Sequence, residues 1–152
     1  MDARKYLVQW LIRYLQNRDL MLKRIKKIEE QGEQVIVEQT DKTTCYYIEP
    51  FSSEFIESIQ KLESDEFSNK ALVVYNTKEN FKELLKHWDR LIEIKNLIIF
   101  FANPFSRLDK KWMVFPKTHH MISGGEIKEG LNSLFLTVEE TTIKEIEKIV
   151  SD

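Results

Sequence analysis

The chain is 152 residues long, with 42% apolar residues, 32% charged residues and a formal net charge of −2 at pH 7. These values predict a single domain, residues 1–152, that can bury a core, and they argue against indiscriminate nucleic-acid binding. No apolar run approaches the roughly 18 residues of a membrane-spanning helix, so we expect no membrane partner. The single cysteine, Cys45, excludes an intramolecular disulfide and a cysteine zinc site. The N-terminus is charged and lacks a signal-peptide pattern, which together with the lone cysteine predicts a cytoplasmic protein.

The first predicted element is one long helix over residues 2–31. Its apolar side chains recur every three or four positions, at Leu7, Trp10, Leu11, Tyr14, Met21, Ile25 and Ile28. Asp2 is a suitable N-cap, and Gly32 can end the helix in a left-handed turn. The periodicity weakens near Asn17, which indicates a kink or a break at that point.

Residues 33–50 are predicted to form a β-hairpin. The segments QVIVEQ and TTCYYIE are rich in residues that favour strands, with Asp41-Lys42 at the turn between them. A helix over residues 51–63 follows, with Ser52 or Ser53 as its N-cap. The side chains expected to face inward from this helix are Phe55, Ile56, Ile59 and Leu62.

The stretch from residue 70 to residue 116 is the centre of the predicted fold. ALVVY (71–75) and NLIIFF (96–101) are short apolar runs typical of parallel strands that are buried on both faces. The segment between them has apolar residues at helical spacing and begins after Thr77, a suitable N-cap. Strand, helix and strand predict a right-handed parallel unit. KWMVF (111–115) then predicts a neighbouring or edge strand.

The last part, residues 117–152, is predicted as a glycine-containing loop, a strand over residues 133–138 and a C-terminal helix with Ile143 and Ile146 inward. The complete pattern predicts an α/β fold, with a mixed sheet of about five or six strands and helices on both faces. Its parts are the N-terminal helix (2–31), an α/β core (33–116) and this C-terminal part.

Charge is distributed unevenly along the chain. Residues 1–32 hold eight basic and four acidic residues, and residues 103–121 hold four basic and one acidic, within a chain that is acidic overall. Such segments can form a local basic surface, and basic side chains beside an aromatic residue can contact phosphates and bases. The residues predicted to contact a nucleic acid or another partner are Arg107, Lys110, Lys111, Lys117 and His119.

Helix, hairpin, buried strand, helix, strand and the aromatic strand 111–115 follow one another in an order that resembles the restriction-endonuclease-like superfamily. The nearest pattern is that of the archaeal Holliday junction resolvases, over roughly residues 2–116. The resemblance implies a mixed-sheet core in which acidic residues hold a divalent metal and a Glu-x-Lys signature supplies a lysine that assists the attacking water. In this chain Val73-Val74-Tyr75 stands at that position, so the catalytic signature is not intact.

The function predicted first is therefore a non-catalytic module with a nuclease fold, a pseudo-nuclease, which binds DNA, RNA or a protein of nucleic-acid metabolism without a cofactor. No metal site is predicted, because adjacent histidines such as His119-His120 point in different directions. The enzymatic alternative is a divergent Mg²⁺-dependent nuclease that uses Glu38, Asp41, Glu49 and Lys78 in a shifted arrangement.

A structural or oligomerising domain is the third interpretation. Under it the chain forms a homodimer through aromatic side chains of the first helix, namely Tyr6, Trp10 and Tyr14.

Overall fold

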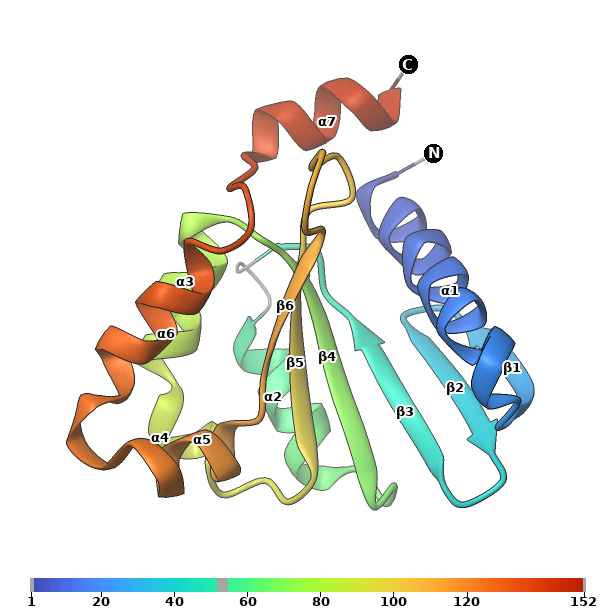
Figure 1. Cartoon of the computed structure of the whole chain (residues 1–152), viewed down its shortest axis with the longest axis horizontal. Coiled ribbons are helices and arrows are strands. Elements are labelled where there is room, and N and C mark those ends of the chain that lie inside the picture. Colours follow the sequence, from blue (N-terminus) through green and yellow to red (C-terminus); the bar gives the residue numbers. More distant parts are fainter. Residues whose placement is uncertain (1, 52–54, 152) are drawn as a thin grey trace.

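The computed structural model describes residues 2–51 and 55–151. The strands are β1 (Ile25–Gln31), β2 (Gln34–Gln39), β3 (Thr43–Ile48), β4 (Asn69–Tyr75), β5 (Leu97–Ala102) and β6 (Lys111–Val114). The helices are α1 (Ala3–Leu22), α2 (Phe55–Ser64), α3 (Lys78–Lys86), α4 (Trp88–Leu91), α5 (Pro116–Ser123), α6 (Ile127–Phe135) and α7 (Ile143–Ser151), with a 3-10 turn, η2 (Gly124–Glu126). Figure 1 shows a mixed α/β architecture with helices on both faces of the sheet, as expected.

The described strands form one six-stranded sheet in the order β1-β2-β3-β4-β5-β6. β1, β2 and β3 pair antiparallel, β3, β4 and β5 run parallel, and β6 returns antiparallel to β5. The predicted hairpin, the parallel unit and the edge strand that includes Trp112 are therefore confirmed. Thr77 caps α3 as expected, because its side chain accepts the backbone N–H of Asn80 at 3.1 Å.

The predicted helix over residues 2–31 is wrong beyond Leu22. The chain adopts a left-handed conformation at Lys23 (φ 50°), and the Asp19 carboxylate accepts the next two backbone N–H groups, those of Arg24 and Ile25. Residues 25–31 then form β1. A bulge at residues 25–27 lets Ile25 and Ile28 face the same side, a spacing that also fits a helix. Gly32 is left-handed as expected, but it lies in the β1–β2 turn.

Four further expectations need correction. The helix between β4 and β5 is interrupted at His87, which separates α3 from α4. The strand expected over residues 133–138 does not form, because Leu131 and Phe135 lie one helical turn apart and bury the face of α6. The segment predicted as a glycine-containing loop forms α5, the 3-10 turn η2 and the first part of α6. Ile56 of α2 is 47% exposed, and the caps proposed at 52 and 53 lie outside the described residues.

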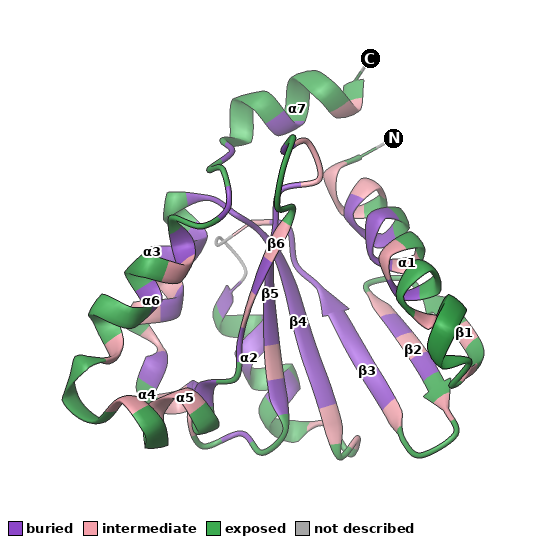
Figure 2. Cartoon of the chain, viewed as in Figure 1, coloured by how far each residue is buried: buried purple, intermediate pink, exposed green. Residues whose placement is uncertain are grey.

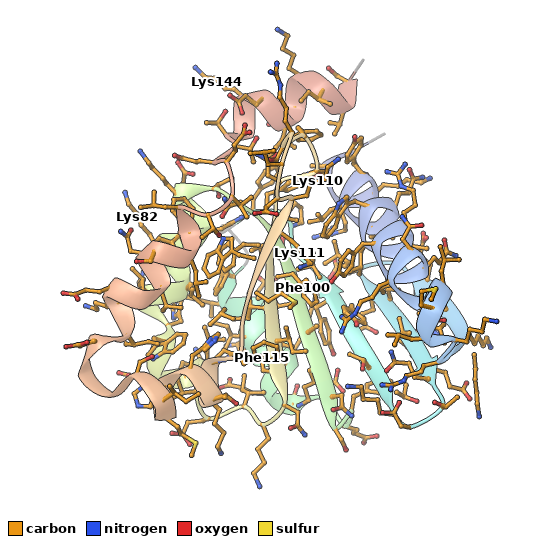
Figure 3. All side chains as sticks on the ribbon, in the orientation of Figure 1. Lys82, Phe100, Lys110, Lys111, Phe115 and Lys144 are labelled. Atoms are coloured by element: carbon orange, nitrogen blue, oxygen red, sulfur yellow. The ribbon has the colours of Figure 1, made fainter. Side chains whose placement is uncertain are left out.

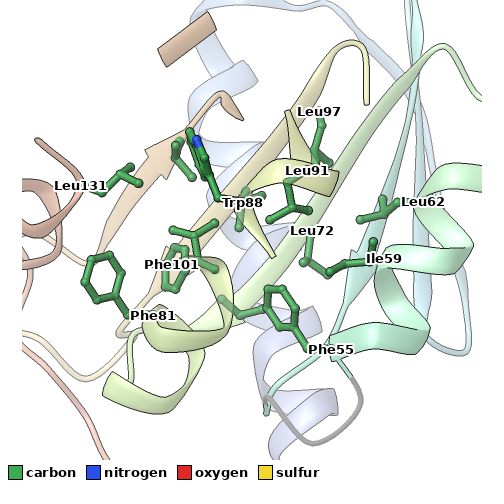
Figure 4. Packing of buried hydrophobic residues seen from close by; sticks show 14 of the residues in the cluster. Phe55, Ile59, Leu62, Leu72, Phe81, Trp88, Leu91, Leu97, Phe101 and Leu131 are labelled. Carbon is green, nitrogen blue, oxygen red and sulfur yellow. The ribbon is translucent and has the colours of Figure 1, made fainter. Parts of the chain in front are cut away.

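Two apolar clusters hold the layers together, one on each face of the sheet. On the first face, α1 and Ile146 of α7 pack on alternate residues of β2 to β5. On the second face, α2, α3, α4 and α6 pack on the other residues of the same strands (Figure 4). β4 and β5 are consequently buried on both sides (Figure 2). No helix within the described residues is long and apolar enough to cross a membrane.

Candidate functional site

The four residues of the nuclease alternative do not come together. Asp41 lies in the β2–β3 turn and Glu38 pairs with Thr43 beside it, whereas Glu49 follows the opposite end of β3. The six-residue strand between them spans about 20 Å. Lys78 begins α3 near the carboxyl ends of the parallel strands, where Glu49 also lies, and its Nζ lies 3.9 Å from the Glu140 carboxylate. Within residues 2–51 and 55–151 no three metal-ligating side chains gather to hold an ion.

Glu49 is a buried carboxylate whose neighbours belong to the chain itself. Arg4 of α1 places Nη2 3.4 Å from Glu49, and its Nε donates to the carbonyl of Ile48 at 3.1 Å. The Ser58 hydroxyl of α2 donates to the same carboxylate at 3.3 Å. This ion pair joins helices from both faces to the end of β3, which is a structural arrangement.

The residues predicted for partner contact lie in two groups at opposite ends of β6. Arg107 and Lys110 lie in the β5–β6 loop and Lys111 begins β6, whereas Lys117 and His119 lie on α5 beyond the other end. Lys111 places its Nζ 5.2 Å from the ring centroid of Tyr14. His119 is half-buried, and its Nδ1 accepts the backbone N–H of Phe115 at 3.1 Å. Burial lowers the pKa of His119 below its ordinary value.

A hollow of about 260 Å³ lies between α1 and β6, on the face of the sheet that α1 partly covers. A second hollow of about 460 Å³ continues it toward α5. Both are lined by Lys42, Asn69, Asn96, Ile98 and Phe115, so they form one groove over the amino ends of the parallel strands.

We call this surface the basic groove. Its floor consists of Tyr46, Ile98, Phe100, Met113 and Phe115, and its basic rim consists of Arg18, Arg24, Lys42, Lys95 and Lys117. A further lysine in the lining, Lys70, donates its Nζ to the carbonyl of Leu62 at 2.6 Å and is not part of the rim. Figure 3 shows Phe100 and Phe115 next to β6, with Lys111 and Lys110 following toward the β5–β6 loop.

Side chains along β6 point alternately to the two faces of the sheet, which explains why apolar groups reach the basic groove. Trp112 and Val114 face the core, so the side chains of residues 111 and 113 point toward the α1 side. α1 lies mainly over β1, β3 and β4, and it leaves β5 and β6 less covered (Figure 1). Phe115 is accordingly 37% exposed, and Met113 and Ile98 are half-buried.

The groove is predominantly positive. Its two acidic residues are Asp19, which accepts two backbone N–H groups, and Asp41 in the β2–β3 turn. Burial raises the pKa of Tyr46 to about 12, so its phenol is a neutral hydrogen-bonding group at physiological pH. An anion or a phosphate chain is the ligand chemistry that five basic side chains around an aromatic floor favour.

Of the five basic rim residues, only Lys117 is among the residues that the sequence predicts for partner contact. The excess of basic residues in positions 1–32 indicated a basic surface, and Arg18 and Arg24 come from this segment. Lys42 and Lys95 had no such signal, because they lie in short turns within acidic segments. Only the packing of the sheet brings these turns beside α5.

No protein-family model, no curated protein and no solved structure matches this chain. The structure defines it as an α/β protein with a six-stranded mixed sheet and a basic groove on a sheet face.

Proposed function

We propose that this chain is a non-catalytic binding module that holds a single-stranded nucleic acid in the basic groove. One observation carries the proposal: five basic side chains surround a partly exposed apolar floor that includes the ring of Phe115. Lysine and arginine neutralise phosphates, and aromatic or apolar side chains pack against unpaired bases. A duplex hides its base faces, so the floor favours a single strand.

The site implied by the resemblance supports a binding role rather than cleavage. Val73 and Tyr75, which stand where the superfamily has its Glu-x-Lys signature, are fully buried in the core. The Tyr75 hydroxyl donates to the carbonyl of Ala3 at 2.7 Å, which ties that strand to α1. Because apolar packing fills this position, we propose a restriction-endonuclease-like core without nuclease chemistry, a pseudo-nuclease. The separation of Asp41 from Glu49 argues against the nuclease alternative.

Fluorescence anisotropy with labelled single-stranded DNA and RNA, and with a duplex control, tests this function. We expect both single strands to bind more tightly than the duplex. Each phosphate contact contributes a slope of about −0.7 to the plot of log K against log salt, so four contacts give a slope of about −3. Between about 50 mM and about 200 mM salt the affinity then falls roughly 50-fold.

Single substitutions distinguish binding in the basic groove from general attraction between the protein's positive charges and the nucleic acid. Lys42→Ala and Lys117→Ala should each weaken binding and reduce the salt slope by about 0.7. Phe115→Ala should cost about 1–3 kcal/mol of binding free energy through lost stacking. Lys82→Ala is the matched control, because Lys82 is exposed on α3, away from the groove (Figure 3). Absence of single-strand binding at low salt, or equal losses for Lys42→Ala and Lys82→Ala, would remove the proposal.

A further inference from the structure

The sheet has an exposed edge at β1. This strand lies at one end of the strand order, and β2 is its partner in the described sheet. The outer edge of β1 therefore presents backbone N–H and C=O groups that no described strand pairs (Figure 1). Such an edge is a template for another extended strand, unless its side chains prevent pairing.

The sequence of this edge is complementary to itself. Around Ile28 it reads Lys26-Lys27-Ile28-Glu29-Glu30. An antiparallel pair of two such strands centred on Ile28 places Lys27 opposite Glu29, twice by symmetry, whereas Lys26 lies within the bulge and is not counted as a facing residue. Opposite charges at directly facing positions stabilise a strand pair, and like charges destabilise it.

The charged side chains of β1 are available for such a pairing. Lys26, Lys27, Glu29 and Glu30 are all exposed. None of them forms an ion pair with another of the residues that the structure describes. Lys27 lies opposite Glu38 of β2 in the register of the sheet, so a second copy would place it between two carboxylates.

Apolar surface next to β1 would enlarge the contact. At the end of α1, Leu20 is 69% exposed, Met21 90% and Leu22 49%. A hollow of about 550 Å³ lies between this end of α1 and β1, and residues 25–28 form one of its walls. Strand pairing alone buries less than the roughly 1,000 Å² of a stable interface. The exposed apolar side chains at the end of α1 must therefore contribute to the contact. We expect the resulting dimer to be weak and to depend on protein concentration.

We propose that two copies of this chain pair antiparallel through β1, with Ile28 on the twofold axis, and join their sheets into one. The interface is isologous, since each copy uses the same strand. Two lysines alone would repel a second copy of the edge, and the two glutamates that follow turn this repulsion into attraction. The charge order thus admits the chain's own edge strand in one register and opposes a shifted one. This interface differs from the aromatic face of α1, where Trp10 is buried and stacks on Tyr14.

Analytical ultracentrifugation over a concentration series tests the proposal. The wild type should form a dimer that dissociates on dilution. Lys27→Glu and Glu29→Lys should each weaken dimerisation on the order of tenfold or more, because two like-charged pairs then face each other. The double variant Lys27→Glu/Glu29→Lys should restore the dimer, since it exchanges the charges without removing the complementarity.

Mixing the two single variants provides the sharpest arm of the experiment. The Lys27→Glu chain presents only glutamates at these positions and the Glu29→Lys chain only lysines, so the mixture should form a heterodimer that neither makes alone. Lys82→Glu on α3 is the matched charge-reversal control and should dimerise like the wild type. A wild type that stays monomeric, single variants that dimerise normally, or a double variant that stays monomeric would each overturn the proposal.

Discussion

Buried asparagine side chains help to cover the carboxyl ends of the parallel strands, where parallel α/β proteins commonly bind ligands. The Asn76 Oδ1 accepts the indole N–H of Trp112 at 2.8 Å, and its Nδ2 donates to the carbonyls of Val138 and Glu139 at 3.1 and 3.2 Å. Asn103, at the end of β5, donates to the carbonyl of Glu139 at 2.8 Å. These side chains fasten the segment before α7 across the carboxyl ends of the strands, so they serve the fold.

Asn76→Ala should lower the free energy of unfolding by roughly 3 kcal/mol. The substitution leaves the buried Trp112 N–H and the carbonyl of Val138 without this partner, whereas the carbonyl of Glu139 keeps Asn103. Each unsatisfied buried group costs about 1–3 kcal/mol. Urea denaturation measures the change. Asn132→Ala, at an exposed position of α6, is the control and should stay within about 0.5 kcal/mol of the wild type. A loss below about 1 kcal/mol for Asn76→Ala would contradict the assigned network.

His119 should make the protein less stable in mild acid. Its pKa in the folded state lies below the ordinary 6.5, because burial disfavours the charged imidazolium. As the pH falls through 6.5 the unfolded chain takes up this proton first, so the free energy of unfolding decreases until the folded state is protonated as well. Protonation of the imidazole also removes the Nδ1 acceptor for the backbone N–H of Phe115.

The measurement compares urea denaturation of the wild type and of His119→Gln at a series of pH values on both sides of 6.5. The difference between the two stability curves should change with pH in that window, with the wild type losing more on acidification. Parallel curves would show that His119 contributes nothing to the pH dependence.

At the scale of elements, the boundary between α1 and β1 shows how a helix is ended without glycine. Lys23 adopts φ 50°, a conformation that costs a residue with a Cβ about 1–2 kcal/mol. Its backbone N–H donates to the carbonyl of Asp19 at 2.8 Å. The Asp19 carboxylate then satisfies the next two N–H groups. The strand that follows pairs with β2 and supplies the interactions that offset this strain.

Lys23→Gly should therefore stabilise the protein by about 0.5–1 kcal/mol, after the greater unfolded-state entropy of glycine is included. Thermal and urea denaturation measure the effect. The same substitution at Lys82, in the exposed interior of α3, should destabilise the protein by about 1 kcal/mol. If both variants lose stability equally, the left-handed ending of α1 is not the conformation in solution.

At the scale of the whole molecule, the sheet topology keeps the acidic candidates apart. Asp41 and Glu49 stand at opposite ends of β3, and within the described residues no group of three or more metal-ligating side chains forms that could hold an ion. We therefore expect Mg²⁺ to leave the melting temperature equal to that in NaCl of the same ionic strength, since only an ion bound to the folded state stabilises it. A saturable rise with Mg²⁺ or Mn²⁺ that Glu49→Gln removes would revive the nuclease alternative.

The sequence by itself determined the local elements. Short apolar runs, helical spacing and the cap at Thr77 define the β2–β3 hairpin and the β4–α3–β5 unit, because these signals depend on residues a few positions apart. Residues 25–31 and 133–138 were assigned wrongly for the same reason: their apolar spacing suits both a helix and a strand. In each case the surface available for packing selected the structure.

Only the tertiary structure decided where the two proposed binding surfaces lie. The basic groove combines side chains from α1, two short turns and α5, which are far apart in the chain and meet only when the sheet assembles. The edge position of β1 likewise follows from strand order, although its order of charges, two lysines followed after Ile28 by two glutamates, can be read from the sequence. Long-range pairing is a property of the whole chain, so no local pattern can specify it.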